Sequence, residues 1–525
     1  MNQLLWILLS LLLSSTALAQ AYDIVVEGGR VIDPETSLDA IRNVGIQADR
    51  IAAISEFPLD GKLVINAKGK VVSPGFIDLH AHGQALGDMR MQVMQGVTTV
   101  LELESGVLPI GQWYSLLEQQ QTPINYGAAS AWTFARIAAF TNTDPSPTPA
   151  YFQDAQKLDE WRFDIASPEQ FDRILELVEQ GLDEGGLGIG INSGYAPGYG
   201  QKEYFALANL AAERGVATYT HTRYISNTEP RSSFEAIKEL IGNSAITGAH
   251  MHLCHVNSGS LRDIHAILDM IEEAQAHGIK VTVEAYPYGA GNGVVGAAIF
   301  TTPDDWRERI DSDAHSFQLG ADRLTEDEFA DLQANAPGTF VTWHYLDETV
   351  PEDLALIDAS VTHPAVSIAS DSVFWAQFTD DGGVTFYTGD EWPLPDDVFS
   401  HPRSAGTFAK VLRSYVRERG LMSLSEAIRK MSLMPAQTLE DFVPQMRSKG
   451  RIQVGMDADI VVFDPKTVAD QSTYENANQP ATGVQTVLVN GEFVVRKSKL
   501  ILDANAGRPI RREVRYLQPV LRAKP

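Results

Sequence analysis

The segment Val71–His82, with the sequence VVSPGFIDLHAH, constrains the fold more than any other part of the chain. An apolar strand enters through a Pro-Gly turn and ends in two histidines, His80 and His82, separated by one residue. Because side chains alternate along a strand, both imidazoles are expected to point to the same side of its tip. Imidazole is a preferred ligand for zinc and similar divalent metals. The segment therefore favours a metal site, although a His-x-His pair also occurs in strands that bind no metal.

The bulk properties bound the possible architectures and partners. A chain of 525 residues with 44% hydrophobic content is long enough for a (β/α)8 barrel with insertions and a small second domain. The formal charge of -27 excludes nucleic acid as a partner, since no basic field is present to displace its counterions. Cys254 is the only cysteine, so no intramolecular disulfide can form.

The first 19 residues are interpreted as a signal peptide. They form an apolar run that ends in the small-x-small pattern Ala17-Leu18-Ala19, with cleavage expected before Gln20. The start of the run carries no Lys or Arg, and a retained membrane anchor is the alternative. The expected location is secreted, in the periplasm, with no membrane span after processing.

The long middle of the chain alternates apolar strands with amphipathic helices, which predicts a parallel sheet closed into a (β/α)8 TIM-type barrel over residues 75–442. Apolar residues recur at helical spacing around Ile174 and around Ile267, and Gly181 and Gly278 are expected to end these helices. Residues 290–360 are rich in Asp, Glu, Pro and Trp with little β periodicity, and we expect them to form a lid over the barrel mouth.

The two chain ends share a sequence pattern that differs from that of the middle. Short β runs broken by Gly and Asp occupy residues 20–74 and again residues 443–525. Neither end makes a sufficient sheet core alone, so they are predicted to pair as one small β-sandwich beside the barrel.

Several predicted strands end in residues that can bind metal or move protons, which in such barrels are expected at the carboxyl ends of strands. Two carboxylates at i and i+2 in an apolar strand are costly to bury unless a metal or a cation compensates them. A lone histidine at a strand tip can be a hydrogen-bonded core residue, and an aspartate after a strand can be a helix cap. The candidates are Glu102 and Glu104, His221, one histidine among His250, His252 and His255, and Asp371.

Longer phrases give the chain a family resemblance. Pro-Gly-Phe-Ile-Asp-Leu-His-Ala-His resembles the first-strand signature of the amidohydrolase superfamily, which are metal hydrolases on a (β/α)8 barrel. The glycine-rich phrase Gly186–Gly198, YTHTRY around His221, LCHVN around His255, EAYPYGAG from Glu284 and the long phrase His401–Ala436 resemble one branch, the N-acyl-D-amino-acid deacylases (D-aminoacylases).

The resemblance implies a role for each matching residue. It implies one or two zinc ions, with Asp371 as catalytic acid and base. Arg403 would clamp a substrate carboxylate, and Tyr288 would polarise the scissile carbonyl. The implied metal ligands are His80, His82, His221 and His255, with Glu104 beside them, and the other expected substrate contacts are Asn257 and Arg223.

The chain also departs from the branch. The branch places a cysteine ligand at the end of strand two, where this chain has Ser105, so a carboxylate is expected to substitute. Many binuclear amidohydrolases bridge their metals with a carboxylated lysine from a middle strand, but no lysine lies between Arg162 and Gln201. Glu104 or Glu102 is then the available bridge. The branch also has a lysine where this chain has Asn257.

The predicted function is zinc-dependent hydrolysis of the C–N amide bond of an N-acyl amino acid of D configuration, or of a short peptide. The alternatives are a dipeptidase or another amidase of the same superfamily, including one for cyclic amides, and a non-catalytic binding barrel.

Overall fold

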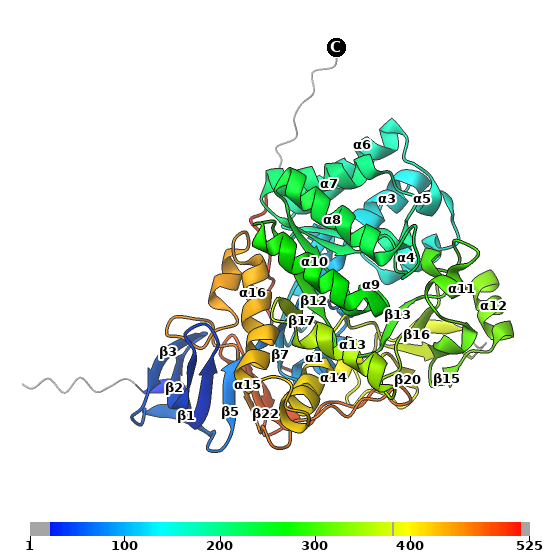
Figure 1. The fold of residues 1–525 in the computed structure, drawn as a ribbon. Coiled ribbons are helices and arrows are strands. Elements are labelled where there is room, and N and C mark those ends of the chain that lie inside the picture. The colour runs from blue at the N-terminus through cyan, green and yellow to red at the C-terminus, as the bar shows by residue number, and fades with distance from the viewer. Residues whose placement is uncertain (1–20, 381–382, 516–525) are drawn as a thin grey trace, which may run out of the picture.

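The computed structural model describes residues 21–380 and 383–515, and Figure 1 shows a helix-covered barrel flanked by a sheet on one side. The predicted signal peptide, residues 1–19, lies outside the described residues. Within the described ranges, no helix combines the length and apolar character needed to cross a membrane.

Eight parallel strands form the predicted (β/α)8 barrel, which is confirmed. They are hydrogen-bonded in the order β17-β12-β11-β10-β9-β8-β7-β6. Their bounds are β6 (Phe76–Asp78), β7 (Val97–Val107), β8 (Asn125–Ala131), β9 (Ile189–Asn192), β10 (Ala217–His221), β11 (His250–Leu253), β12 (Val281–Ala285) and β17 (Val366–Ile368).

Helices lie between the strands and cover the outside of the barrel (Figure 1). From β6 to β17 they are α1 (Leu86–Met94), α2 (Ile110–Glu118), α3 (Trp132–Thr141), α4 (Pro149–Ala155), α5 (Glu160–Phe163), α6 (Pro168–Asp183), α7 (Gln201–Arg214), α8 (Ser233–Thr247), α9 (Val256–Ser260), α10 (Ile264–Ala276) and α13 (Pro351–Thr362). After β17 follow α14 (Arg403–Lys410), α15 (Leu424–Ile428) and α16 (Met434–Leu439).

The apolar faces of α6 and α10 are buried as their spacing predicts, with Ile174 and Ile267 both fully enclosed. Gly278 follows the end of α10 with a φ of +78°, but the prediction that Gly181 ends α6 is wrong. Gly181 lies inside that helix, where an added Cβ would come within 2.3 Å of Ser130 Oγ. This glycine therefore serves close packing against β8.

The two chain ends pair in one further sheet, as expected. Val72 near the start pairs with Val462 near the end. The strand order is β24-β23-β22-β21-β5-β1-β2-β3, with β4 paired to β1. The bounds are β1 (Tyr22–Asp33), β2 (Leu38–Gln47), β3 (Arg50–Ser55), β4 (Gly61–Asn66), β5 (Val71–Pro74), β21 (Ile460–Phe463), β22 (Val484–Val489), β23 (Glu492–Arg496) and β24 (Lys499–Leu500).

The hydrogen bonds run through a single sheet in this domain, and strand β1 accounts for its shape. A bulge between Val26 and Gly29 divides β1 into two halves. The first half pairs with β4 and the second with β5. A bulge increases bending and twist, so the sheet can curve around its own apolar core, in which Val26 and Val31 are fully buried.

Residues 290–360 contain more β structure than their sequence suggests. They include a four-stranded antiparallel sheet in the order β13-β16-β14-β15, made of β13 (Ala290–Val294), β16 (Phe340–His344), β14 (Phe317–Leu319) and β15 (Asp322–Arg323), together with α11 (Trp306–Arg309) and α12 (Glu326–Asn335). The sequence shows little β periodicity here partly because β13 has the sequence AGNGV, in which glycines obscure the alternation.

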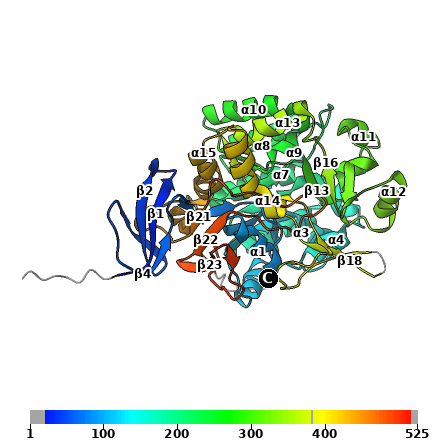
Figure 2. The same cartoon turned by 90° about the horizontal axis from the view of Figure 1, so that it is seen from below.

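A second small sheet joins β18 (Ala376–Phe378), β19 (Val384–Phe386) and β20 (Val398–Phe399). Figures 1 and 2 both show the segment that carries β13, β16, α11 and α12 on the far side of the barrel from β1–β4. Residues of this segment and of β19 line the cavities described below.

The barrel closes beside the two histidines of the opening motif. Ala81 forms a parallel bridge with Ser372, whose carbonyl accepts a hydrogen bond of 2.9 Å from the His82 N–H. Just below, the buried carboxylate of Asp78 accepts from the N–H groups of His80 at 3.2 Å and Ser370 at 3.0 Å, and from the Ser370 hydroxyl. Asp78 thus ties the first and last barrel strands together under the site.

Removing that carboxylate is expected to destabilise the fold. Asp78→Ala leaves several buried donors without an acceptor and should lower the free energy of unfolding by roughly 3 kcal/mol, measured by urea unfolding of the zinc-free protein. The control Asp269→Ala changes an exposed side chain on α10 and should have little effect. Equal stability of the two variants would contradict this role for Asp78.

Candidate metal centre

Three predicted site residues meet where the first and last barrel strands end. His80 Nε2 and His82 Nε2 lie 3.1 Å apart, as the alternation of the motif predicts. The Oδ1 atom of Asp371 lies 3.3 Å from His80 Nε2 and 3.4 Å from His82 Nε2. These three side chains form one group of potential metal ligands.

A second group forms beside the first, from β7, β10 and the end of β11. Glu104 Oε1 lies 2.7 Å from His255 Nε2 and 3.3 Å from His221 Nδ1. The two histidine nitrogens are 3.0 Å apart. The three atoms form a second potential ligand set.

Glu104 connects the two groups. While its Oε1 faces His221 and His255, its Oε2 lies 3.3 Å from His80 Nε2 and 3.6 Å from His82 Nε2. Donor atoms on a tetrahedral zinc ion with bonds of 2.0–2.1 Å are about 3.3 Å apart, which matches most of these separations. The residues present therefore fit two neighbouring divalent cations with Glu104 between them, a position predicted for Glu104 or Glu102.

Glu102 has a different position. Its Oε2 lies 3.0 Å from His82 Nδ1, the ring nitrogen opposite the ligand set. Glu284 lies 2.6 Å from His80 Nδ1, and Ser258 Oγ lies 3.0 Å from His255 Nδ1. Such outer partners fix the orientation of ligand histidines and raise their basicity.

The three histidines of the β11 region separate as expected, with only His255 facing the donor cluster. His252 Nε2 lies 3.1 Å from Glu284, and the rings of His250 and His252 each lie 2.8 Å from the Thr282 hydroxyl. One carboxylate oxygen of Glu284 therefore contacts His80, and the other contacts His252.

Backbone geometry at two site residues could not be predicted from the sequence. His255 has a φ of +31° and Asp371 a φ of +50°, in a region that residues with a Cβ rarely adopt. Such conformations persist where the surrounding structure imposes them, and they cluster at functional sites. Both side chains are thereby turned toward the donor cluster from the ends of their strands.

Two glycines make room for the cluster. A Cβ on Gly190 of β9 would come within 2.5 Å of the Glu104 carbonyl oxygen, and one on Gly194 within 2.6 Å of the His221 ring. The glycine-rich phrase thus lets β9 approach β7 closely, where any side chain at Gly190 would push Glu104 away from the histidines.

Charges within the cluster shift its pKa values strongly. Burial opposes the charged form of Asp371, but Arg403 and His80 outweigh it and lower the pKa of that carboxyl to about 2. Burial likewise opposes the ionised form of Glu104, yet its histidine neighbours hold the pKa of Glu104 well below its ordinary value. For His82, burial is outweighed by Glu102 and Asp371, which raise the pKa to about 9. Protons therefore compensate the buried carboxylates, and a divalent cation would displace them.

Arg403, the predicted clamp for a substrate carboxylate, directly contacts Asp371 of the donor cluster. It is fully buried at the start of α14, with Nη2 3.0 Å from Asp371 Oδ1 and its guanidinium 4.8 Å from the centre of the Tyr286 ring. Its Nε and Nη1 atoms have no hydrogen-bond partner among the described residues. Arg403 thus holds Asp371, and its Nε–H and Nη1–H groups are still available as hydrogen-bond donors. Its role toward a substrate carboxylate stays a prediction.

The other three predicted substrate contacts lie apart from the cluster. Tyr288 lines a different cavity, with Lys410 Nζ 3.7 Å from the centre of its ring. The Asn257 amide donates to Tyr345 Oη at 2.7 Å and to backbone carbonyls. Arg223 lies 3.6 Å from the centre of the Tyr199 ring and pairs with Glu239 at 2.8 Å. The Tyr288 hydroxyl, Asn257 Oδ1 and Arg223 Nε have no hydrogen-bond partner among the described residues, and the roles of these residues toward a substrate stay predictions.

Two tyrosines that were not among the predicted site residues border the cluster. Tyr286 and Tyr195 line a cavity of about 50 Å³ together with His221, His255 and Asp371. The Tyr286 hydroxyl has no hydrogen-bond partner among the described residues. The family resemblance indicated Tyr288 of the phrase EAYPYGAG, and nothing in the sequence distinguished Tyr286 from Tyr288. For Tyr195, the only sequence feature that indicated a role in the site was the glycine-rich phrase in which it lies.

Fold and site together define a barrel with a candidate binuclear metal centre at the carboxyl ends of its strands. The sequence profile of the amidohydrolase family matches residues 63–495, and the chain belongs to this family.

Similar proteins cover nearly the whole chain. An N-acyl-D-glutamate deacylase of Alcaligenes xylosoxydans xylosoxydans is 28% identical, over 89% of this chain and 93% of its own length. A D-aminoacylase of the same organism is 26% identical, over 94% of this chain and 98% of its own length. A crystal structure of N-acyl-D-glutamate deacylase from Bordetella bronchiseptica, complexed with zinc and a phosphonate inhibitor, superposes with a TM-score of 0.72 at 23% identity, covering 94% of this chain and 100% of that one.

Glu284 provides a test of the centre that does not depend on activity. Burial opposes its charged form, but His80 and His252 lower the pKa of Glu284 to about 2, so it is an anion behind His80. Glu284→Gln should weaken zinc binding by about 10- to 100-fold, measured by competition with a chromophoric chelator. The melting temperature of the zinc-free variant serves as the folding control, and unchanged zinc affinity in a folded variant would contradict the assignment.

Proposed function

We propose that this chain is a zinc-dependent deacylase that hydrolyses the amide bond of N-acyl-D-amino acids. The observation that carries the proposal is the convergence of two donor groups on Glu104 at the barrel mouth. Relatives named as N-acyl-D-glutamate deacylase and D-aminoacylase, similar over nine-tenths of the chain, support the substrate class. The inhibitor in the Bordetella bronchiseptica structure is described as a mimic of the tetrahedral intermediate, which supports the reaction type.

The donor set assigns the cation sites. His80, His82 and Asp371 would hold one zinc ion, His221 and His255 would hold the other, and Glu104 would contact both. When bound, zinc supplies Lewis acidity that lowers the pKa of a bound water toward ~7 and polarises a carbonyl oxygen.

The protein's own groups provide the proton transfers. Asp371 is ionised at neutral pH, so its carboxylate can accept a proton from the attacking water and return it to the amine nitrogen as the C–N bond breaks. Arg403 keeps that carboxylate in place through the 3.0 Å contact with Oδ1. The free Tyr286 hydroxyl on the wall of the small cavity is positioned to donate a hydrogen bond to the substrate.

Export of the enzyme to the periplasm is part of the same proposal. It rests on the apolar run of residues 1–19 and its Ala17-Leu18-Ala19 end.

Asp371→Asn tests the proposed chemistry. The zinc-loaded enzyme should release amine from N-acyl-D-amino acids faster than from their L enantiomers, and Asp371→Asn should lower kcat by about a thousandfold because the proton acceptor is lost. Because Asp371 is also a proposed zinc ligand, zinc content is measured in parallel by metal analysis and kcat is compared at equal zinc content.

The exposed Asp397 offers a matched control, and Asp397→Asn should leave kcat unchanged. Normal turnover by Asp371→Asn would overturn its role. Preferential turnover of dipeptides or cyclic amides would instead favour the other amidase activities, and absence of both metal and turnover would favour a binding barrel.

A further inference from the structure

A large apolar cavity opens directly beside the metal centre. Its volume is about 600 Å³, within the usual range for small-molecule sites, and His82 and Glu104 form part of its wall. Most of the lining is apolar and comes from elements far apart in the chain. These side chains include Trp113 and Leu116 of α2, Phe152 of α4, Phe340 of β16, Phe374, and Phe386 of β19.

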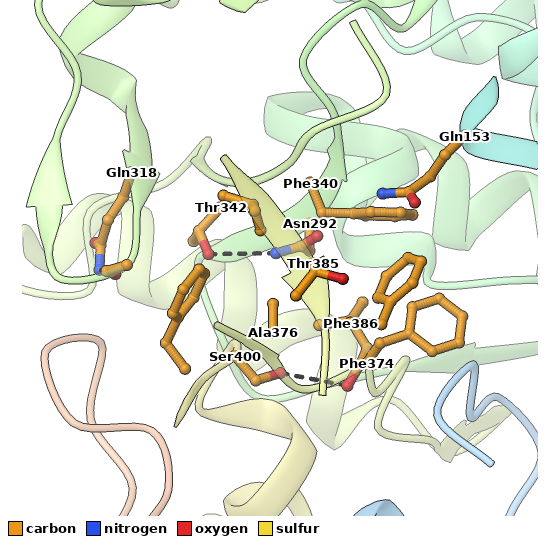
Figure 3. A pocket seen from close by; sticks show the side chains of 14 residues that line it. Gln153, Asn292, Gln318, Phe340, Thr342, Phe374, Ala376, Thr385, Phe386 and Ser400 are labelled. Atoms are coloured by element: carbon orange, nitrogen blue, oxygen red, sulfur yellow. Dashed lines mark hydrogen bonds between the residues drawn. The ribbon is translucent and has the colours of Figure 1, made fainter. Parts of the chain in front are cut away.

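Aromatic rings extend from the metal centre into this cavity. The Phe374 ring centre lies 6.4 Å from that of His82 and 4.9 Å from that of Phe386, and Phe340 lies 6.0 Å from Phe374. Figure 3 shows Phe340, Phe374 and Phe386 close together in a smaller neighbouring pocket, and the same three residues also line the large cavity. All three rings are only half-buried, so a bound apolar group would remove exposed aromatic surface from water.

Charge distinguishes the two ends of the site. Among the described residues, no lysine or arginine lines the large cavity, whereas the carboxylates of Asp88, Glu102, Glu104 and Asp390 do. A substrate carboxylate placed there would meet like charges.

A second, smaller cavity beside the centre suits the amino-acid end of a substrate. This cavity measures about 50 Å³, and its lining includes Tyr286, whose buried hydroxyl has no hydrogen-bond partner among the described residues. A Cβ added to Gly291 in its wall would lie 3.0 Å from that hydroxyl and 3.6 Å from Arg403 Nη1. A group close to Gly291 would therefore approach both donors.

We infer that the large cavity is an acyl site, and that the preferred substrates carry a medium- to long-chain aliphatic acyl group. The inference rests on the proposed deacylase function. As the C–N bond breaks, water would add its hydroxyl to the acyl carbon and a proton to the nitrogen. The fatty-acid product would keep its chain in the large cavity and its new carboxylate at the metal centre, and the D-amino acid would lie in the small cavity. An acetyl group would leave most of the aromatic wall exposed to water.

A chain-length series tests the inference. N-acetyl, N-butanoyl, N-octanoyl and N-dodecanoyl derivatives of one D-amino acid should show kcat/KM values that rise by up to about fourfold per added methylene until the cavity is filled. Binding of dodecanoate and of acetate to the zinc-loaded enzyme, measured calorimetrically below the micellar concentration, provides a readout without turnover, and dodecanoate should bind at least about tenfold more tightly.

Two adjacent positions on α2 give a matched pair of variants. Leu116 is 45% exposed and lines the cavity, whereas Ser115 is exposed and does not. Leu116→Glu should lower kcat/KM for the octanoyl and dodecanoyl substrates by about tenfold or more while sparing the acetyl substrate, because it places a charge against the chain. Ser115→Glu should change neither.

The outcomes separate this inference from the function on which it rests. If kcat/KM does not change with chain length and the acetyl substrate is turned over, the acyl site is overturned but the deacylase function stands. The same holds if Leu116→Glu loses turnover of N-acetyl-D-phenylalanine, because the cavity would then hold the amino-acid side chain. Absence of turnover with every N-acyl-D-amino acid would overturn the deacylase. Equal binding of dodecanoate and acetate would then overturn the apolar site as well.

Discussion

One buried carboxylate holds the site together. Glu104 is almost completely enclosed, yet it stays ionised because histidines from both donor groups surround it. An isolated charge in this position would be very costly, so the histidines and the anion must be positioned together. The approach of β9 to β7 at Gly190 and the outer partners Glu102 and Glu284 all serve this arrangement.

The barrel positions these ligands because its first and last strands meet beside His80 and His82. Asp78 joins the first and last strands directly below His80, and Ser372 continues their pairing up to His82. The ligands therefore project from a rigid rim and not from free loops. The inserted segments that follow β12 and β17 contribute to the walls of both the small and the large cavity beside the rim.

Sequence reasoning reached the barrel and the cluster because both depend on local patterns. Alternation in the His80 motif and histidines at strand ends survive in a single sequence, and the predicted ligands do meet. The features that it missed depend on tertiary contacts. Gly181 packs against β8, and the surroundings of Asp371 impose its left-handed backbone. Tyr286 lines the cavity at the metal centre, whereas Tyr288 lines a different cavity. The charge of Arg223 is compensated by Glu239, which no local pattern revealed.

Anomalous diffraction at the zinc edge, from crystals of the zinc-loaded protein, tests the central role of Glu104 most directly. We expect anomalous density on both sides of its carboxylate, beside His80 and His82 and beside His221 and His255, and Glu104→Ala should lose at least one of these peaks. Zinc bound elsewhere, or both peaks unchanged in Glu104→Ala, would contradict the account.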